Sequence, residues 1–312
     1  MNIAQLSNQI VLMFCLMAVG VLINKLHFMS SDTSSDLTNI LLYIVSPCLI
    51  IQAFEQKYSS ARMQELLVVM LGVCIVYIIS IVISNVCFAK TKDQTTKRAA
   101  IFGSIFSNAG FMGVPLAAAL FGNKGVFFAV ASLAGYSLFN WTYGVTIFKE
   151  KREFSWMNLR EQAFNALVNP NIIAIFVGGL VFICSFKVPE IINRPATYLS
   201  SLNTPLSMIV IGNSLANSRF SKADFNKSLL GALLLRNLVY PMLTYVVLLG
   251  LGLSGVSLLT TVLLFACPTA GLVVLFSLQA NDNPTPGIAL MTMSTVLSIV
   301  TIPLVFFLMT IF

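Results

Sequence analysis

The stretch that decides the fold is SNAGFMGVPL at residues 107–116, because it breaks a helix within an apolar segment. Proline inside a helix removes one backbone hydrogen bond and clashes with the preceding turn. The glycines at 110 and 113 loosen the backbone before Pro115 further, because glycine has no Cβ atom. The freed backbone groups need a partner, and Asn108 can offer its side chain. We therefore expect a helix that is interrupted within this stretch.

The composition around this stretch is that of a membrane protein. The chain has 312 residues, of which 57% are hydrophobic and only 9% are charged, whereas a soluble domain carries about 25% charged residues. The excess apolar surface must face lipid. The longest polar stretch, at 149–169, has about 20 residues and cannot bury a core of its own. In hydrocarbon, freed backbone groups are tolerated only where protein or water satisfies them.

Ten apolar segments follow one another along the chain, and most approach the ~20 residues that cross a bilayer as a helix. They predict an all-α polytopic membrane protein with ten transmembrane helices. The seventh segment fits least well, because three asparagines dilute it. The segments are residues 10–26, 37–54, 65–88, 99–121, 126–148, 171–186, 196–216, 228–253, 257–279 and 287–312.

Lysine and arginine are distributed unevenly between the loops. With the N-terminus outside, twelve of the 18 lie in inside loops, five lie in outside loops, and Arg236 lies within a segment. Because inside loops carry the excess of these residues, we expect both termini outside a bacterial inner membrane. These residues are not interleaved with aromatic residues as on a nucleic-acid surface, so no nucleic-acid partner is expected.

The two halves of the chain repeat the same signals. A Ser-Pro pair at 46–47 in the second segment matches a Thr-Pro pair at 204–205 in the seventh, and Pro115 in the fourth matches Pro268 in the ninth. Each pair lies five segments apart. An odd offset places the second copy upside down relative to the first, as in the inverted repeats of many secondary transporters.

The predicted organisation is therefore two five-helix repeats, at 1–148 and 170–312. The residues between them, 149–169, form a cytoplasmic linker. Its apolar residues fall at roughly helical spacing among charges, which indicates a short amphipathic helix at the membrane interface. A flexible linker is the alternative, and no chemistry is expected there in either case.

Two breaks at matching positions would point half-helix N-termini into one cavity. Helix N-termini carry partial positive charge and free N–H groups, which suits an anion. The alternative is that proline and glycine only kink or pack these helices, as is common in membrane proteins. The candidate substrate-binding residues at the breaks are Asn108, Ala109, Gly110, Gly113, Pro115, Pro268, Thr269, Ala270 and Gly271.

Charged residues add one further candidate. All eleven Asp and Glu residues fall in loops or at segment ends, so we do not expect coupling through a mid-membrane carboxylate; backbone carbonyls and hydroxyls can still hold sodium. Arg236 lies within the eighth segment. It either meets a substrate carboxylate, or it snorkels to the interface or caps backbone carbonyls. Asn140 is a lesser cavity candidate, with a helix–helix contact as the alternative.

Other classes of protein lack the residues that they need. The chain has a single histidine, no paired carboxylates, no His/Cys/Asp cluster and no nucleophile motif, so we expect no enzyme, no metal site and no cofactor. A sensor would usually carry a soluble domain. The sequence therefore favours a secondary transporter of small organic anions. A channel or facilitator for small neutral or cationic solutes is the alternative.

The run Asn-Ala-Gly-Phe-Met-Gly-Val-Pro-Leu at 108–116 resembles the fourth-span motif of the auxin efflux carrier family of bacterial permeases. These are relatives of the plant PIN auxin transporters, and some carry malonate or related carboxylates. The resemblance covers the whole chain. It is supported by the length, the ten spans, Pro268 and the Asn-Pro-Asn that opens the second half.

This resemblance implies a scaffold domain from spans 1, 2, 6 and 7 and a transport domain from spans 3–5 and 8–10. It also implies that spans 4 and 9 cross where both unwind, that substrate binds beside the crossing, and that one domain moves against the other like an elevator. A homodimer through the scaffold is implied as well. Mono- or dicarboxylates such as malonate or malate are the implied substrates. Auxin is disfavoured, because the ninth span has no asparagine at its break.

Overall fold

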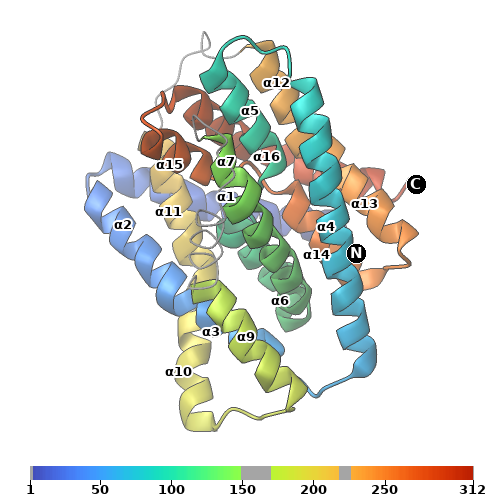
Figure 1. The fold of residues 1–312 in the computed structure, drawn as a ribbon. Helices are drawn as coiled ribbons and strands as arrows, with labels where there is room; N and C mark the ends of the chain where they lie inside the picture. Colours follow the sequence, from blue (N-terminus) through green and yellow to red (C-terminus); the bar gives the residue numbers. More distant parts are fainter. Residues whose placement is uncertain (1–2, 149–169, 218–225, 312) are drawn as a thin grey trace, which may run out of the picture.

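The computed structural model describes residues 3–148, 170–217 and 226–311, and these residues form helices joined by short connections (Figure 1). The predicted linker at 149–169 lies outside them. Within the described residues, six helical stretches are long and apolar enough to cross a membrane: Leu6–Lys25, Asp32–Phe54, Ser60–Cys87, Ala109–Ile147, Lys227–Gly250 and Thr285–Leu308. The prediction of an all-helical polytopic protein is confirmed. Ten spans in an inverted repeat stay a prediction.

The α-helices have the following bounds. They are α1 (Ile3–Lys25), α2 (Ser31–Ile40), α3 (Ser46–Phe54), α4 (Ser60–Cys87), α5 (Gln94–Ile105), α6 (Val114–Phe139), α7 (Val145–Ile147), α9 (Pro170–Ile183), α10 (Glu190–Ser201), α11 (Asn203–Asn217), α12 (Lys227–Leu234), α13 (Tyr240–Gly250), α14 (Gly255–Ala266), α15 (Leu272–Gln279) and α16 (Thr285–Leu308). In the part of the chain that the structure describes, four π-helical turns interrupt them: η1 (Leu41–Val45), η2 (Ala109–Gly113), η3 (Asn140–Gly144) and η5 (Leu235–Val239).

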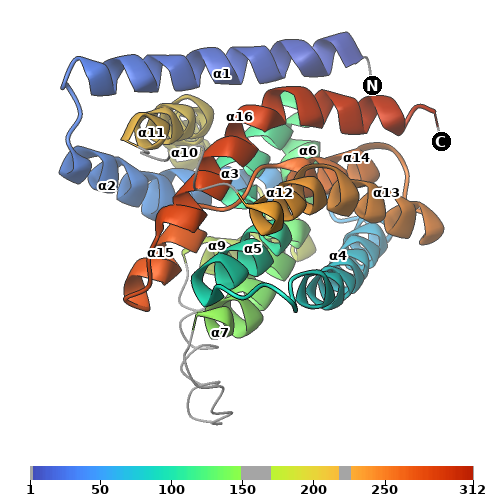
Figure 2. The same ribbon diagram turned by 90° about the horizontal axis from the view of Figure 1, so that it is seen from above.

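Helices α1 and α11 form a tightly packed pair at one edge of the molecule (Figure 2). Gly20 of α1 lies against the backbone of α11, and Gly212 of α11 lies against the backbone of α1, so a Cβ atom at either position would collide with main chain. The side chain of Asn24 then donates to those of Asn213, at 2.8 Å, and Asn217, at 3.0 Å. Small residues let the two backbones approach closely, as is common between helices in membranes.

The two segments that share the Ser/Thr-Pro pattern also lie together. Ser46 of α3 donates to the side chain of Asn203 at 3.1 Å. Almost two turns further along, the Gln52 amide nitrogen donates to the hydroxyl of Thr197 at 2.7 Å, and its oxygen accepts from Ser200 at 2.6 Å. These side-chain hydrogen bonds join the second predicted segment to the seventh.

Three of the π-turns end two residues before a proline. Pro47, Pro115 and Pro241 each stand at the second residue of the helix that follows. Because proline has no N–H, a helix loses one hydrogen bond there. In each case the residue before the proline bonds to the carbonyl five residues back, which is the wider π spacing. The chain thus passes each proline without ending the helix.

Gly122 divides the helix labelled α6. Its backbone angles are φ 58° and ψ −151°, which are not helical and which residues with a Cβ atom rarely adopt. The residue falls between the fourth and fifth predicted segments. Residues 114–121 therefore continue the fourth segment, and residues after Gly122 begin the fifth.

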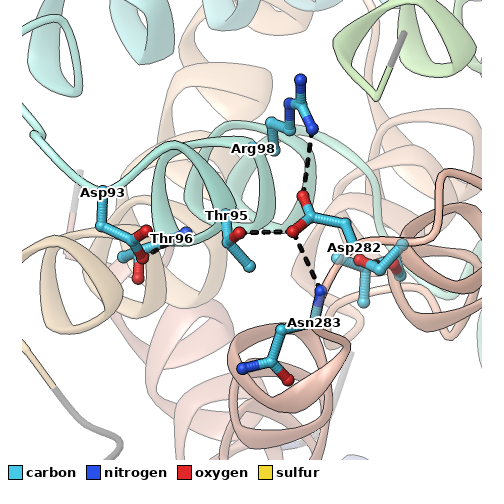
Figure 3. A network of polar contacts seen from close by, with 8 residues as sticks. Asp93, Thr95, Thr96, Arg98, Asp282 and Asn283 are labelled. Atoms are coloured by element: carbon cyan, nitrogen blue, oxygen red, sulfur yellow. Dashed lines mark hydrogen bonds and ion pairs between the residues drawn. The ribbon is translucent and has the colours of Figure 1, made fainter. Parts of the chain in front are cut away.

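Polar contacts hold the first turn of α5 to the turn between α15 and α16 (Figure 3). The Asp282 carboxylate accepts from Arg98 at 3.1 Å and from the hydroxyl of Thr95. Asp93 caps α5 by accepting from the backbone N–H of Thr96 at 2.9 Å. Hydrogen bonds from Thr96 also hold the pKa of the Asp93 carboxyl below its usual range.

Candidate functional site

Two helices end in the interior, and the chain segments that follow them pair with each other. Helix α5 ends at Ile105 and is followed by extended chain at 106–107. Helix α14 ends at Ala266 and is followed by extended chain from Cys267. Ser107 and Thr269 form an isolated antiparallel bridge. The N–H of Asn108 donates to the carbonyl of Pro268 at 2.6 Å, and the N–H of Ala270 donates to that of Phe106 at 2.9 Å. The predicted breaks in the fourth and ninth segments are therefore present, and they meet.

Side chains from two further helices hold the second break. The hydroxyl of Ser294 in α16 accepts from the backbone N–H of Thr269 at 3.0 Å and donates to the side-chain oxygen of Asn237 at 2.7 Å. The hydroxyl of Thr269 donates to the carbonyl of Gly103 in α5 at 2.9 Å. Ser294, Thr269 and Asn237 are polar and buried. Thr269 thus has an internal partner for both its N–H and its hydroxyl.

Arg236 lies on the side of the breaks where α5 and α14 end. Its side chain is fully buried. One terminal nitrogen donates to the carbonyls of Ser104, at 3.3 Å, and Ile105, at 2.6 Å, and the other donates to the carbonyl of Phe265. The guanidinium also lies 6.0 Å from the centroid of the Phe265 ring, within range of a cation–π contact. Of the roles considered for Arg236, capping of backbone carbonyls matches these contacts.

The helices that follow the breaks present their N-terminal ends. The first N–H groups of a helix have no partner within it, and η2 begins at Ala109 and α15 at Leu272. In α15 the N–H groups of Val273 and Val274 already donate to the carbonyls of Ala270 and Gly271. Around them, Asn108 and Gly110 are partly exposed and Gly271 is exposed. The other candidate residues at the breaks are buried: Ala109, Gly113, Pro115, Pro268, Thr269 and Ala270. The accessible part of the predicted site is therefore Asn108, Gly110 and Gly271.

Asn140 is fully buried in the π-turn η3. Neither atom of its side-chain amide has a hydrogen-bond partner in the described structure. A Cβ atom built on Gly144, one turn away, would lie 3.1 Å from the Asn140 oxygen and equally close to the rings of Phe102 and Phe106. Asn140 thus lies among aromatic residues beside the end of α5, and not among the accessible residues at the breaks.

Phe111 links the first break to the α1–α11 pair. It packs against a small hydrophobic cluster that is separate from the main core, whose buried members are Met29, Leu41, Val45 and Val210. These residues come from the α1–α2 loop, η1 and α11. Sequence reasoning did not single out Phe111 or Ser294. The signal for Phe111 was its place between two glycines in the broken stretch; Ser294 had no local signal.

Two comparisons with known proteins indicate which family this chain belongs to. The model of a family described as membrane transport protein matches residues 5–306, nearly the whole chain. An uncharacterized transporter of Methanocaldococcus jannaschii is similar at 29% identity over 220 residues, which cover 66% of this chain and 68% of that protein. The chain is therefore a multi-pass membrane protein that belongs to the membrane transport protein family, the auxin efflux carrier family of transporters.

Proposed function

We propose that this chain is a secondary transporter of small organic anions, in the size class of mono- and dicarboxylates such as malonate or malate. Family membership supports the transporter role. One observation supports an anionic substrate. At the paired breaks, Arg236 occupies the ends where α5 and α14 finish, whereas the N-terminal ends of η2 and α15 lie beside the accessible Asn108, Gly110 and Gly271.

The electrostatic argument favours an anion at these N-terminal ends. A helix N-terminus carries roughly half a positive charge, and none of the residues at either break is acidic. A cation at that place would meet two positive helix ends without a carboxylate. An anion would find N–H donors there, together with the side-chain amide of Asn108. Hydrogen bonds to a charged group are about twice as strong as those between neutral groups.

We further propose that transport uses alternating access with an elevator-like motion. In this proposal the ten spans form an inverted repeat, with a scaffold from spans 1, 2, 6 and 7 and a transport domain from spans 3–5 and 8–10. The close packing of α1 on α11 supports a rigid scaffold. Phe111 is a contact between the two proposed domains that such a motion would have to break.

The surroundings of the protein belong to the same proposal. We place it in a bacterial inner membrane with both termini outside, because the charge distribution between the loops favours that orientation. Lipid is then its neighbour on the outer faces of the helices, where large apolar side chains such as Phe176, Leu180 and Val246 are exposed. A homodimer through the scaffold completes the proposal.

Thermal unfolding of the purified protein with a panel of carboxylates, amino acids and neutral analogues tests the substrate class. A ligand that binds only the folded protein stabilises it by about 2.7 kcal/mol at 100 times its Kd. We expect a carboxylate to raise the Tm of the wild type, and Asn108→Ala to lose this shift. Asn39→Ala is the matched control, because Asn39 is exposed on α2. Stabilisation by cations or neutral solutes alone, or an unchanged shift in Asn108→Ala, would contradict the proposal.

A further inference from the structure

Arg236 has no carboxylate partner among the described residues, although its side chain is fully buried. A buried charge normally needs an opposite charge or a complete set of hydrogen bonds. Its terminal nitrogens find backbone carbonyls from two helices that are distant in sequence, Ser104 and Ile105 at the end of α5 and Phe265 at the end of α14. Arg236 therefore joins the last turns of both interrupted helices.

The positive charge of Arg236 faces partial negative charges of similar total size at the two helix ends. A helix C-terminus carries roughly half a negative charge, so the ends of α5 and α14 together present about one negative charge to one guanidinium. A guanidinium has five N–H donors in a fixed planar fork, and it keeps its positive charge. The fork lets one side chain serve two helix ends at once. A lysine would carry the same charge on a single nitrogen.

The carbonyls that Arg236 holds lie directly before the two breaks. Ile105 precedes the extended residues 106–107, and Phe265 lies two residues before Cys267, where the second extended stretch begins. The extended stretches then pair through Ser107 and Thr269. Fixing the ends of α5 and α14 therefore fixes where the following segments start, at Ala109 and Leu272.

We propose that Arg236 is a positioning residue for transport: it clamps the ends of α5 and α14 and thereby sets the geometry of the anion site, without touching the substrate. This inference rests on the proposed function, because only that function makes the paired breaks an anion site. It makes Arg236 part of the transport machinery through its charge and its fork geometry. Under this proposal, Arg236 does not bind the carboxylate of the substrate.

The test compares Arg236→Met and Arg236→Lys with the wild type. Methionine approximates the side-chain length and removes the charge, while lysine keeps the charge and loses the fork. Arg194→Met is the matched control, because Arg194 forms an exposed pair with Glu190 far from the breaks. Initial rates of carboxylate uptake are measured in proteoliposomes and divided by the amount of folded transporter, which removes any loss that is due to misfolding alone.

A disulfide reports the geometry of the breaks independently of transport. Residues paired in an antiparallel bridge have Cα atoms about 4.5–5.5 Å apart, which is within the range that a disulfide can span. Ser107→Cys and Thr269→Cys are therefore introduced together in a chain whose six natural cysteines are replaced. The yield of the cross-link on oxidation measures how well the two stretches stay paired.

We expect Arg236→Met to lower both the cross-link yield and the uptake rate per folded molecule at least tenfold, with Arg236→Lys between it and the wild type. Oxidation of the cysteine pair should restore part of the carboxylate affinity in Arg236→Met. Full cross-linking and full uptake in Arg236→Met would overturn the proposal. So would an intact cross-link with weaker binding of carboxylates but not of their neutral amides, because that result makes Arg236 a substrate ligand. If cross-linking depends on Arg236 but the wild type carries no anion, the clamp stands and the proposed substrate class fails.

Discussion

Replacement of Ser294 by alanine tests how the second break is held. The Ser294 hydroxyl makes two side-chain hydrogen bonds, one from the N–H of Thr269 and one to Asn237. Hydrogen bonds between membrane helices average about 0.6 kcal/mol each, and a buried donor left without a partner costs about 1–3 kcal/mol. Because Ser294→Ala leaves the N–H of Thr269 unpaired in the interior, we expect it to lower the free energy of unfolding by about 1–3 kcal/mol.

The control for Ser294→Ala lies one turn further along the same helix. Ser298 is equally buried, but its hydroxyl donates only to the carbonyl of Thr295 within α16. Ser298→Ala should therefore cost no more than about 0.5 kcal/mol. Unfolding of the purified protein in mixed micelles gives both free energies. The rise in Tm expected with carboxylates then shows whether the proposed anion site loosens with the break. Equal effects of the two substitutions on stability and on ligand binding would refute the reasoning.

Three further outcomes are expected. Gly212→Ala should destabilise the chain by at least about 1–3 kcal/mol, because its Cβ atom would meet the backbone of α1; thermal unfolding should show Gly250→Ala, which has open space, to be nearly neutral. Asp282→Ala should cost under about 1 kcal/mol through the loss of Arg98, and a double-mutant cycle should show this coupling shrink as salt is added. The hydrogen bonds that lower the pKa of Asp93 stabilise the fold at pH values above the ordinary carboxyl pKa, and this contribution disappears as pH falls through the lowered pKa. A profile of stability against pH for Asp93→Asn should lack this decline at acidic pH.

The helical membrane fold could be predicted because it depends on composition and on proline and glycine alone. The breaks near Asn108 and Pro268 followed from the local chemistry of proline in a helix, and the structure has both. The π-turns were not predicted. For the three that precede a proline, the position depends on which carbonyl the residue before the proline reaches, and the apolar pattern changes little between α and π spacing.

The candidate site could be predicted only in part, because sequence gives the residues of a break and not their exposure. Of the nine residues proposed at the breaks, Asn108, Gly110 and Gly271 are accessible, while the rest are buried by neighbouring helices. Ser294 and Phe111 act through contacts with residues far away in the chain. Such contacts follow from the packing of the whole molecule, so no local pattern marks them.

The buried Arg236 and the lack of acidic residues at the two breaks fit one electrostatic condition. Two helices that end in the interior create a negative end, and two that begin there create a positive end. The protein places Arg236 at the negative end, where its two terminal nitrogens donate to carbonyls of both helices and its Nε has no partner among the described residues. A fixed carboxylate at the positive end would neutralise that end in the same way and would compete with an anionic substrate. Under the proposed function, a positive end without a fixed counter-charge would let the substrate supply that charge, and binding would be strongest for a substrate with negative charge.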